Sequence, residues 1–170
     1  MLLIIIAVIA VIMVYAIKSY NLFVQYRNQA NNASSSVDVM LKKRFDLIPE
    51  VLEACKGYAN YEKETLQRIT QLRTQTLSTM SHSEKDDAAN FAGEVTRRTL
   101  ATVEAYPELK ASHHFMHLQR TITEAEEQLS AARRFHNGAV TAFNNLCQSF
   151  PTNIIASICG FRKMELFQFK

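Results

Sequence analysis

The chain has 170 residues, of which 48% are hydrophobic and 21% charged, and its formal net charge is +3. With four glycines, three prolines and no tryptophan, it has too few turn residues for an all-β domain, which needs a turn signal every ~8–12 residues. The positive charge is small and dispersed, which argues against the basic face of a nucleic-acid-binding domain.

The first seventeen residues carry no charged side chain, and Lys18 is the first charge. Burying such residues at about −0.3 to −0.6 kcal/mol each favours membrane insertion by roughly 3–7 kcal/mol. A helix of this length is about 25 Å long, slightly short of a hydrocarbon core of about 30 Å. Lys18 can reach the interface, and Tyr20, Leu22 and Phe23 extend the apolar face. We therefore predict a transmembrane anchor over residues 1–19.

Two signals decide between this anchor and a cleaved secretory signal. A signal peptide has basic residues before its apolar run and a small-x-small site after it. The chain instead opens Met1-Leu2 and continues past the run with Lys18-Ser19-Tyr20-Asn21, which favours an uncleaved anchor.

The charges after the run predict its direction. Lys18 and Arg27 precede the first acid, Asp38, so the positive-inside rule predicts a single-pass inner-membrane protein with its bulk in the cytoplasm. The chain has three cysteines, Cys55, Cys147 and Cys159. Their odd number, and a spacing that shows no framework of disulfide pairs, fit a reducing compartment. We expect each of them to be a buried thiol.

Four stripes of apolar residues at alternating steps of three and four predict helices after the anchor. They are Phe23, Tyr26, Ala30, Ala33 and Val37; Leu41, Phe45, Ile48, Leu52, Cys55, Ala59, Glu62, Leu66 and Ile69; Ala88, Phe91, Val95, Thr99 and Thr102; and Leu118, Ile122, Ala125, Leu129, Ala132, His136, Ala139, Phe143 and Leu146. Each stripe must be buried against the others. The expected fold is all-α, with an antiparallel four-helix bundle over residues 20–150.

Three proline positions and one polar stretch predict the breaks between helices. Asp46-Leu47-Ile48-Pro49 fits a new helix start, with Asp46 as the cap and Pro49 in the first turn. The alternative is one long helix kinked at Pro49, because the stripe runs through it. Residues 78–87 read as a polar loop, with Ser83 as the cap of the next helix. Tyr106-Pro107 and Phe150-Pro151 should end the third and fourth helices.

The tail, residues 151–170, mixes apolar and basic side chains. It fits either an interfacial amphipathic helix or a segment packed on the base of the bundle. Packing is favoured, because short apolar segments dock on protein cores more often than on lipid.

A series of short motifs, in order and spacing, resembles the LemA family of bacterial membrane-anchored helical proteins. The motifs are Tyr20-Asn21, Val37-Asp38-Val39, Leu41-Lys42-Lys43-Arg44, Asp46-Leu47-Ile48-Pro49, Lys56-Gly57-Tyr58-Ala59 with Glu62, Tyr106-Pro107-Glu108-Leu109-Lys110 with Leu118-Gln119, Ala132-Arg133-Arg134-Phe135-His136-Asn137, and Phe150-Pro151-Thr152-Asn153 leading to Gly160-Phe161. The resemblance implies a four-helix bundle behind a single N-terminal span and implies no catalytic residues. The chain departs from the family at His136, where tyrosine is usual, and at His113-His114, where the family is more polar. His136 falls on a stripe, so we expect its ring to be at least partly buried.

Candidate chemistry is sparse. A di-iron bundle needs Glu-x-x-His on two helices, and the sequence contains none. His113 and His117 are four residues apart and with His114 could hold a metal, but nearby ligands to complete the shell are lacking. Lys42-Lys43-Arg44 fits either a lipid-phosphate or partner contact or, as we favour, the solvated end of a helix near Phe45.

We therefore predict a non-enzymatic, membrane-anchored scaffold or adaptor, with no catalytic, cofactor or metal site and no nucleic-acid partner. It would contact the lipid bilayer and an unidentified membrane or envelope protein, or associate with itself, since Glu62, Thr99 and Thr102 leave the core of the bundle polar in places. Two alternatives stay open. One is a membrane-shaping protein that assembles laterally and inserts its tail, and the other is a metal-binding regulator that uses the four histidines at 113, 114, 117 and 136.

Overall fold

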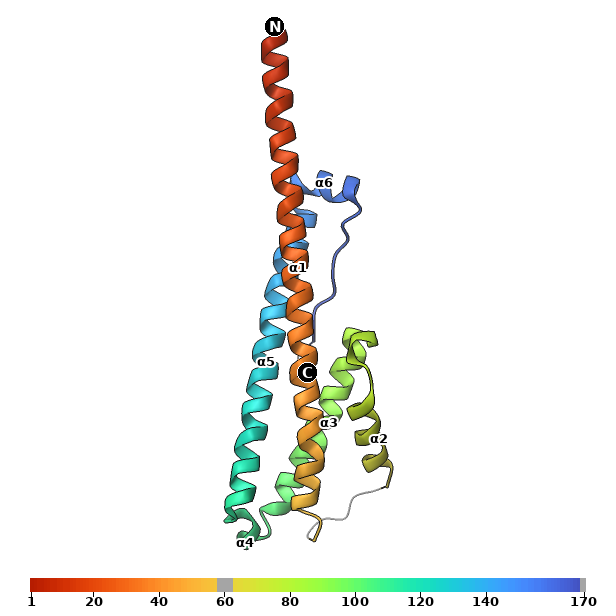
Figure 1. The fold of residues 1–170 in the computed structure, drawn as a ribbon, viewed down its shortest axis with the longest axis vertical. Coiled ribbons are helices and arrows are strands. Elements are labelled where there is room, and N and C mark those ends of the chain that lie inside the picture. The colour runs from red at the N-terminus through yellow and green to blue at the C-terminus, as the bar shows by residue number, and fades with distance from the viewer. Residues whose placement is uncertain (58–62, 169–170) are drawn as a thin grey trace. The chain divides into compact units, whose positions relative to one another are not determined.

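The computed structural model describes residues 1–57 and 63–168, and every regular element in these ranges is a helix (Figure 1). In chain order the elements are α1 (Leu2–Ala54), α2 (Lys63–Thr74), a 3-10 turn (Leu77–Thr79), α3 (His82–Val103), α4 (Pro107–Lys110), α5 (His113–Gln148) and α6 (Thr152–Cys159). The all-α fold class is thus confirmed for the described residues.

The chain divides into two compact units. The first contains Met1–Ala33 and Arg134–Leu166, and the second contains Ser34–Arg133 together with the end of the chain from Phe167. Helices α1 and α5 contribute residues to both units, α6 belongs to the first, and α2, α3 and α4 belong to the second.

Helix α1 carries two kinds of apolar surface. Its first seventeen residues are exposed on nearly every side, with Leu3 81% and Val11 69% exposed. This stretch is long and apolar enough to cross a membrane. Beyond it the apolar residues narrow to one stripe, in which Phe23, Ala30 and Ala33 are buried in the first unit. The first predicted stripe is therefore confirmed.

Pro49 lies inside α1, so the predicted helix start at Asp46 is wrong. An interior proline removes one hydrogen bond and costs about 3 kcal/mol. The apolar side chains on both sides of Pro49 are buried, namely Phe45, Ile48, Val51 and Leu52. Each contributes about 1.5–3 kcal/mol by burial, so together they outweigh the proline. The long-helix alternative is the observed one.

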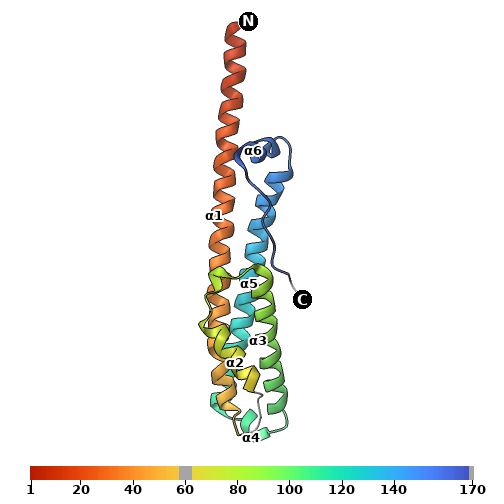
Figure 2. The ribbon, with the colours of Figure 1, turned by 90° about the vertical axis from the view of Figure 1, so that its right-hand side faces the viewer.

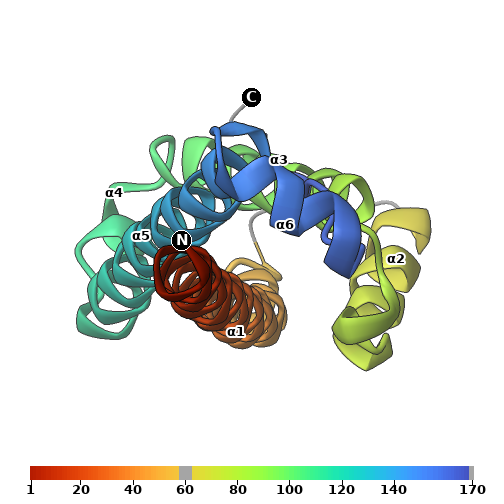
Figure 3. The same cartoon turned by 90° about the horizontal axis from the view of Figure 1, so that it is seen from above.

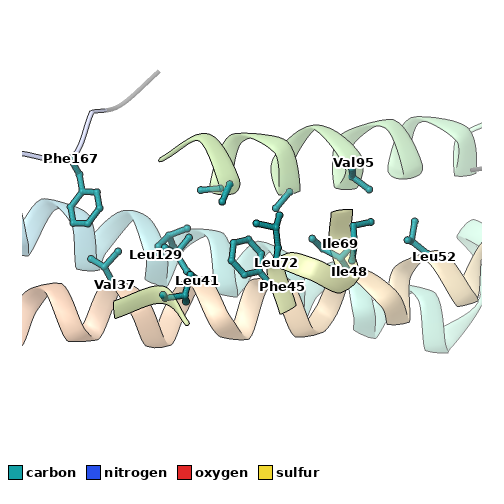
Figure 4. Packing of buried hydrophobic residues seen from close by; sticks show 14 residues of the cluster. Val37, Leu41, Phe45, Ile48, Leu52, Ile69, Leu72, Val95, Leu129 and Phe167 are labelled. Atoms are coloured by element: carbon teal, nitrogen blue, oxygen red, sulfur yellow. The ribbon is translucent and has the colours of Figure 1, made fainter. Parts of the chain in front are cut away.

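One hydrophobic cluster forms the core of the second unit (Figure 4). Helix α1 supplies five of its buried residues, α2 and α3 supply six, and α5 supplies Leu129, with Leu77 and Phe167 completing the set. Viewed along the helices, α3 lies between α5 and α2 (Figure 3). Within the second stripe Ile69 is buried but Leu66 is 42% exposed, while Ala59 and Glu62, with Tyr58, lie outside the described residues.

Helix α3 begins two residues earlier than the sequence analysis expected. Its cap is Ser81 and not Ser83. The Ser81 hydroxyl accepts a bond from the Glu84 N–H at 3.2 Å, and the Ser81 N–H donates to the Glu84 carboxylate at 2.7 Å. This capping box satisfies two backbone groups that a helix start would otherwise leave exposed.

The two later breaks are confirmed. Tyr106 has φ −125° and ψ 87°, outside helical geometry, and Pro107 opens the short α4. Helix α5 ends at Gln148, just before Phe150-Pro151. Helix α6 ends at Cys159 and is followed by Gly160, whose φ of 73° lies in the left-handed region that glycine tolerates.

We predict that Pro49→Ala stabilises the protein, because the helix regains a hydrogen bond in its interior. The expected gain in the free energy of unfolding is up to about 3 kcal/mol. Pro107→Ala is the matched control, since proline at the first position of a helix loses nothing there. Urea unfolding of the full chain in detergent, followed by circular dichroism, measures both. A smaller gain for Pro49→Ala than for Pro107→Ala would contradict the account.

We predict that Ser81→Ala destabilises the protein by about 1 kcal/mol, as is typical for a lost cap, whereas Ser83→Ala has little effect. The bonds from the Ser81 backbone and side chain lower the pKa of Glu84 below its ordinary value of 4.5. This contribution is therefore complete above pH 4.5 and is lost as the pH falls through the lower folded pKa. The Ser81→Ala variant keeps the backbone bond and loses the bond from the Ser81 hydroxyl to the Glu84 carboxylate at 2.8 Å. The difference between wild type and variant should therefore shrink in part over that range, and a constant difference would contradict the bond between hydroxyl and carboxylate.

Candidate functional site

The residues that sequence reasoning singled out are not brought together in the structure. His113, His114 and His117 are all exposed at the start of α5, and His136 is fully buried in the first unit, as expected from its stripe position. In the described part of the chain, no three histidine, cysteine or acidic residues lie close enough to hold a metal ion.

The three cysteines differ in their surroundings. Cys55 is buried, Cys147 is half-buried and Cys159 is exposed, and all three are free thiols, so the expectation of a buried thiol is wrong for Cys159. Burial raises the pKa of the Cys55 and Cys147 thiols, and Lys163 partly offsets the rise at Cys147. A raised pKa disfavours the reactive thiolate at these two positions.

The basic run Lys42-Lys43-Arg44 does not lie at a helix end, because α1 continues to Ala54. The macrodipole interpretation is therefore wrong. Each side chain makes a contact within the second unit instead. Lys42 donates to the carbonyl of Arg73, Lys43 donates to the Gln128 side chain at 3.0 Å, and Arg44 pairs with Glu126 at 2.7 Å.

Two ion pairs are buried in the second unit. Lys85 pairs with Asp38 at 2.5 Å and Arg133 pairs with Asp86 at 2.7 Å. The side chains of Lys85, Asp86 and Arg133 are no more than 11% exposed. Burial lowers the pKa of Arg133, while the Asp86 carboxylate raises it and the positive charge of Arg44 lowers it further. The sequence signal for these pairs is charge on the buried face of a helix, which a search for apolar stripes overlooks.

The end of the chain packs on this buried charge. The Gln168 N–H donates to Asp86 at 2.9 Å. The Phe167 ring is buried, with its centre 4.4 Å from that of His82 and 5.8 Å from the Arg133 guanidinium carbon. The packing interpretation of the tail is therefore confirmed for Phe167. Phe169 and Lys170 lie outside the described residues.

A groove of about 830 Å³ runs between α3 and α5 in the second unit. Its charged lining residues are Arg44, Arg97, Arg133, Glu94, Glu104 and Glu126. Three cations face three anions, so the groove offers no excess charge to a phosphate or to nucleic acid. Such a mixed surface suits a protein partner whose own charges complement it.

Gly93 allows Arg44 to occupy one wall of this groove. A Cβ at Gly93 would lie 2.7 Å from Nη2 of Arg44, which is too close for a carbon. The absence of a side chain at Gly93 therefore leaves room for the guanidinium beside Glu126. Burial lowers the pKa of Arg44 and Glu126 partly restores it. The Arg44 side chain is thus largely withdrawn from water, whereas that of Glu126 stays 44% exposed.

The first unit holds a second, apolar groove of about 330 Å³. It is lined by Ala16, Ile17 and Tyr20 of α1 and by Ile155, Ile158 and Cys159 of α6. Figures 1 and 2 both show α6 beside α1.

Aromatic packing and an amide fix the segment around α6 in the first unit. The Phe161 ring stacks on Phe23 at 4.7 Å and lies 5.8 Å from Tyr20. The side chain of Asn144 donates to the carbonyl of Met164 and accepts from its N–H, both at 2.9 Å.

The profile of the LemA family matches residues 33–170. This chain belongs to the LemA family. The match contains every motif of the resemblance except Tyr20-Asn21, which precedes it.

The chain is similar to a LemA protein and to magnetosome proteins. The Protein LemA of Metamycoplasma hominis is 30% identical over 84% of the chain. The Magnetosome protein MamQ 2 of Paramagnetospirillum magneticum is 23% identical over 89% of the chain, and the Magnetosome protein MamQ of Magnetospirillum gryphiswaldense is 22% identical over the same share. In each case the chain spans 65% of the length of the relative.

We predict that Gly138→Ala stabilises the protein by about 1 kcal/mol, the usual gain for replacing glycine in a helix, because a Cβ there meets nothing within 4 Å. Gly93→Ala should gain less or lose stability, since its Cβ displaces Arg44 from Glu126. Urea unfolding of the two variants measures the difference. Equal gains would show that Arg44 moves aside freely.

Proposed function

We propose that the chain is a non-catalytic, membrane-anchored scaffold or adaptor of the bacterial inner membrane, acting through protein–protein contact or self-association. The observation that carries this proposal is the exposure of the first seventeen residues in the folded chain. An apolar surface of that extent has no stable place in water, and its length suits a bilayer.

The second unit is the part that we propose to meet the partner. We take its segments of α1, α2, α3 and α5 to act as an antiparallel four-helix bundle held in the cytoplasm by the anchor. Support for the direction comes from Lys18 and Arg27, which follow the apolar run before the first acid. Support for the contact comes from the charge-balanced groove between α3 and α5.

The polar positions on the stripes do not argue for self-association in the way that the sequence suggested. Thr99 is buried, and its hydroxyl donates to the carbonyl of Val95 in its own helix at 2.8 Å. Thr102 bonds Arg98 in the same manner at 3.1 Å. Their hydroxyls are satisfied locally, so the groove is the better candidate for a contact between chains.

A membrane-shaping role is a second candidate. The observation in its favour is the exposure of Ile154 and Ile158 on α6, at 50% and 80%. This role needs lateral assembly and also contact between the tail and lipid.

We expect the full chain, purified from native membranes in mild detergent, to be larger than a monomer or to carry a stoichiometric protein partner. Ala101→Arg puts a bulky charge in the groove and should lower recovery of the partner or oligomer by at least about tenfold. Ala131→Arg is the matched control, because Ala131 is an exposed helical alanine that does not line the groove. Mass spectrometry and particle size measure the outcome.

Two results would count against the proposal. Recovery of the wild type only as a lone monomer would contradict the scaffold role. Unchanged association of the Ala101→Arg variant would place the contact away from the groove.

A further inference from the structure

We propose that α6 lies in the interfacial layer of the bilayer that holds the anchor, and that an acyl chain of a phospholipid fills the apolar groove between α6 and the last turn of the anchor. This inference rests on the proposed membrane anchoring of α1 and adds a second lipid contact to it.

The groove places α6 at the level where the anchor meets the membrane surface. Ile17 is the last residue of the uncharged run and Lys18 is the first charge. Ala16 and Ile17 line the groove opposite Ile155 and Ile158 of α6. An anchored Ile17 therefore brings α6 to the boundary between acyl chains and headgroups.

Protein contacts hold α6 in one orientation. Ala156 is buried against the aromatic residues Phe23 and Phe143, and Ile155 packs on the same cluster. The left-handed Gly160 turns the chain, and Phe161 stacks on Phe23 directly after it. The inner face of α6 is thus fixed by the first unit itself.

The outer face of α6 is amphipathic. Ile154 and Ile158 are four residues apart and form one exposed apolar stripe, and Phe150, just before the helix, is also 80% exposed. Asn153 and Ser157, also four apart, form an exposed polar stripe beside it. A helix that lies in the interface has one stripe for the acyl chains and one for the headgroups.

Exposed cations lie close in sequence to both segments that line the groove. Lys18 follows the uncharged run directly, and Arg162 and Lys163 follow α6. Their charges suit the phosphates of the lipid headgroups.

Lipid fits this surface better than a soluble partner does. The wall formed by Ala16 and Ile17 belongs to the anchor, and a soluble protein cannot reach it once the anchor is inserted. The groove also continues the apolar surface of the anchor, which lipid already covers. A second copy of the chain is the other occupant, and the experiment separates the two.

The test uses the absence of tryptophan from the sequence. Ile158→Trp places a single fluorophore on the apolar stripe, at an exposed position that tolerates a large side chain. Ser157→Trp, on the polar stripe, is the matched control, and Met13→Trp reports on the anchor. Each full-length variant is reconstituted in bilayers of phosphatidylcholine and phosphatidylglycerol that carry bromine near either the headgroup end or the methyl end of the acyl chains.

We expect lipid brominated near the headgroup to remove most of the I158W fluorescence, and lipid brominated near the methyl end to remove less. The S157W fluorescence should fall less with either lipid. Quenching of M13W without quenching of I158W would overturn the inference and leave the anchor in place. Lack of quenching of all three would overturn the anchor as well.

Two further outcomes are decisive. A blue-shifted I158W emission that brominated lipid does not quench would mean that protein covers the stripe, which overturns the lipid assignment. Equal quenching of I158W and S157W would overturn the proposed orientation of α6. Circular dichroism confirms that each variant keeps its helical content.

Discussion

The rest of the structure depends on the continuity of α1, which runs as one helix from Leu2 to Ala54. A segment in lipid must satisfy every backbone group internally, so an apolar span has to be a helix. Extending a helix that has already started is far easier than nucleating a new one, and α1 accordingly runs on to Ala54. Up to Ile17 the helix is apolar on nearly every side, and beyond Ile17 its apolar residues form a single stripe. The spacing of that stripe, from Phe23 through Val37 and Phe45 to Cys55, sets where the other helices can bury their own apolar faces.

Buried ion pairs fix the alignment of the helices along their axes, which apolar stripes alone do not determine. Apolar stripes specify register less sharply than ion pairs do, because their side chains are alike in chemistry. The buried pairs of Asp38 with Lys85 and of Asp86 with Arg133 join α1 to α3 and α3 to α5. Such pairs contribute little net stability, but separating one partner from the other costs about 3–5 kcal/mol. A slipped register would strand both aspartates, so the pairs select one arrangement. Phe167 and Gln168 then attach the end of the chain to the same pair.

The sequence predicts the parts of this fold that follow from apolar periodicity and from the residue before a proline. It misses the parts that depend on a balance of opposing free energies, such as a local backbone cost against burial of side chains. The breaks at Tyr106-Pro107 and Phe150-Pro151 are found correctly, because the residue before proline leaves helical geometry in either case. Pro49 misleads, because its local cost is outweighed by burial of Phe45 and Leu52, which propensity alone does not weigh. Ser81 was identifiable from the spacing Ser81-x-x-Glu84, but Ser83 offered a hydroxyl closer to the acids. The roles of Lys43, Arg44 and Arg133 depend on partners more than 45 residues away, and no local pattern specifies those.

The proposed anchor affects the two grooves in different ways. The apolar groove beside α6 needs the bilayer, since exposure of the apolar side chains of Ile158 and Ile17 to water is unfavourable. The groove between α3 and α5 presents exposed charges of both signs, and contacts of that kind are weak in solution because each pair is screened and solvated. Confinement to a membrane raises the effective concentration of a partner held in the same bilayer, which turns a weak contact into a populated one without any new interaction. With the anchor that we propose, a charge-balanced groove is therefore suited to reversible assembly with other membrane-bound proteins.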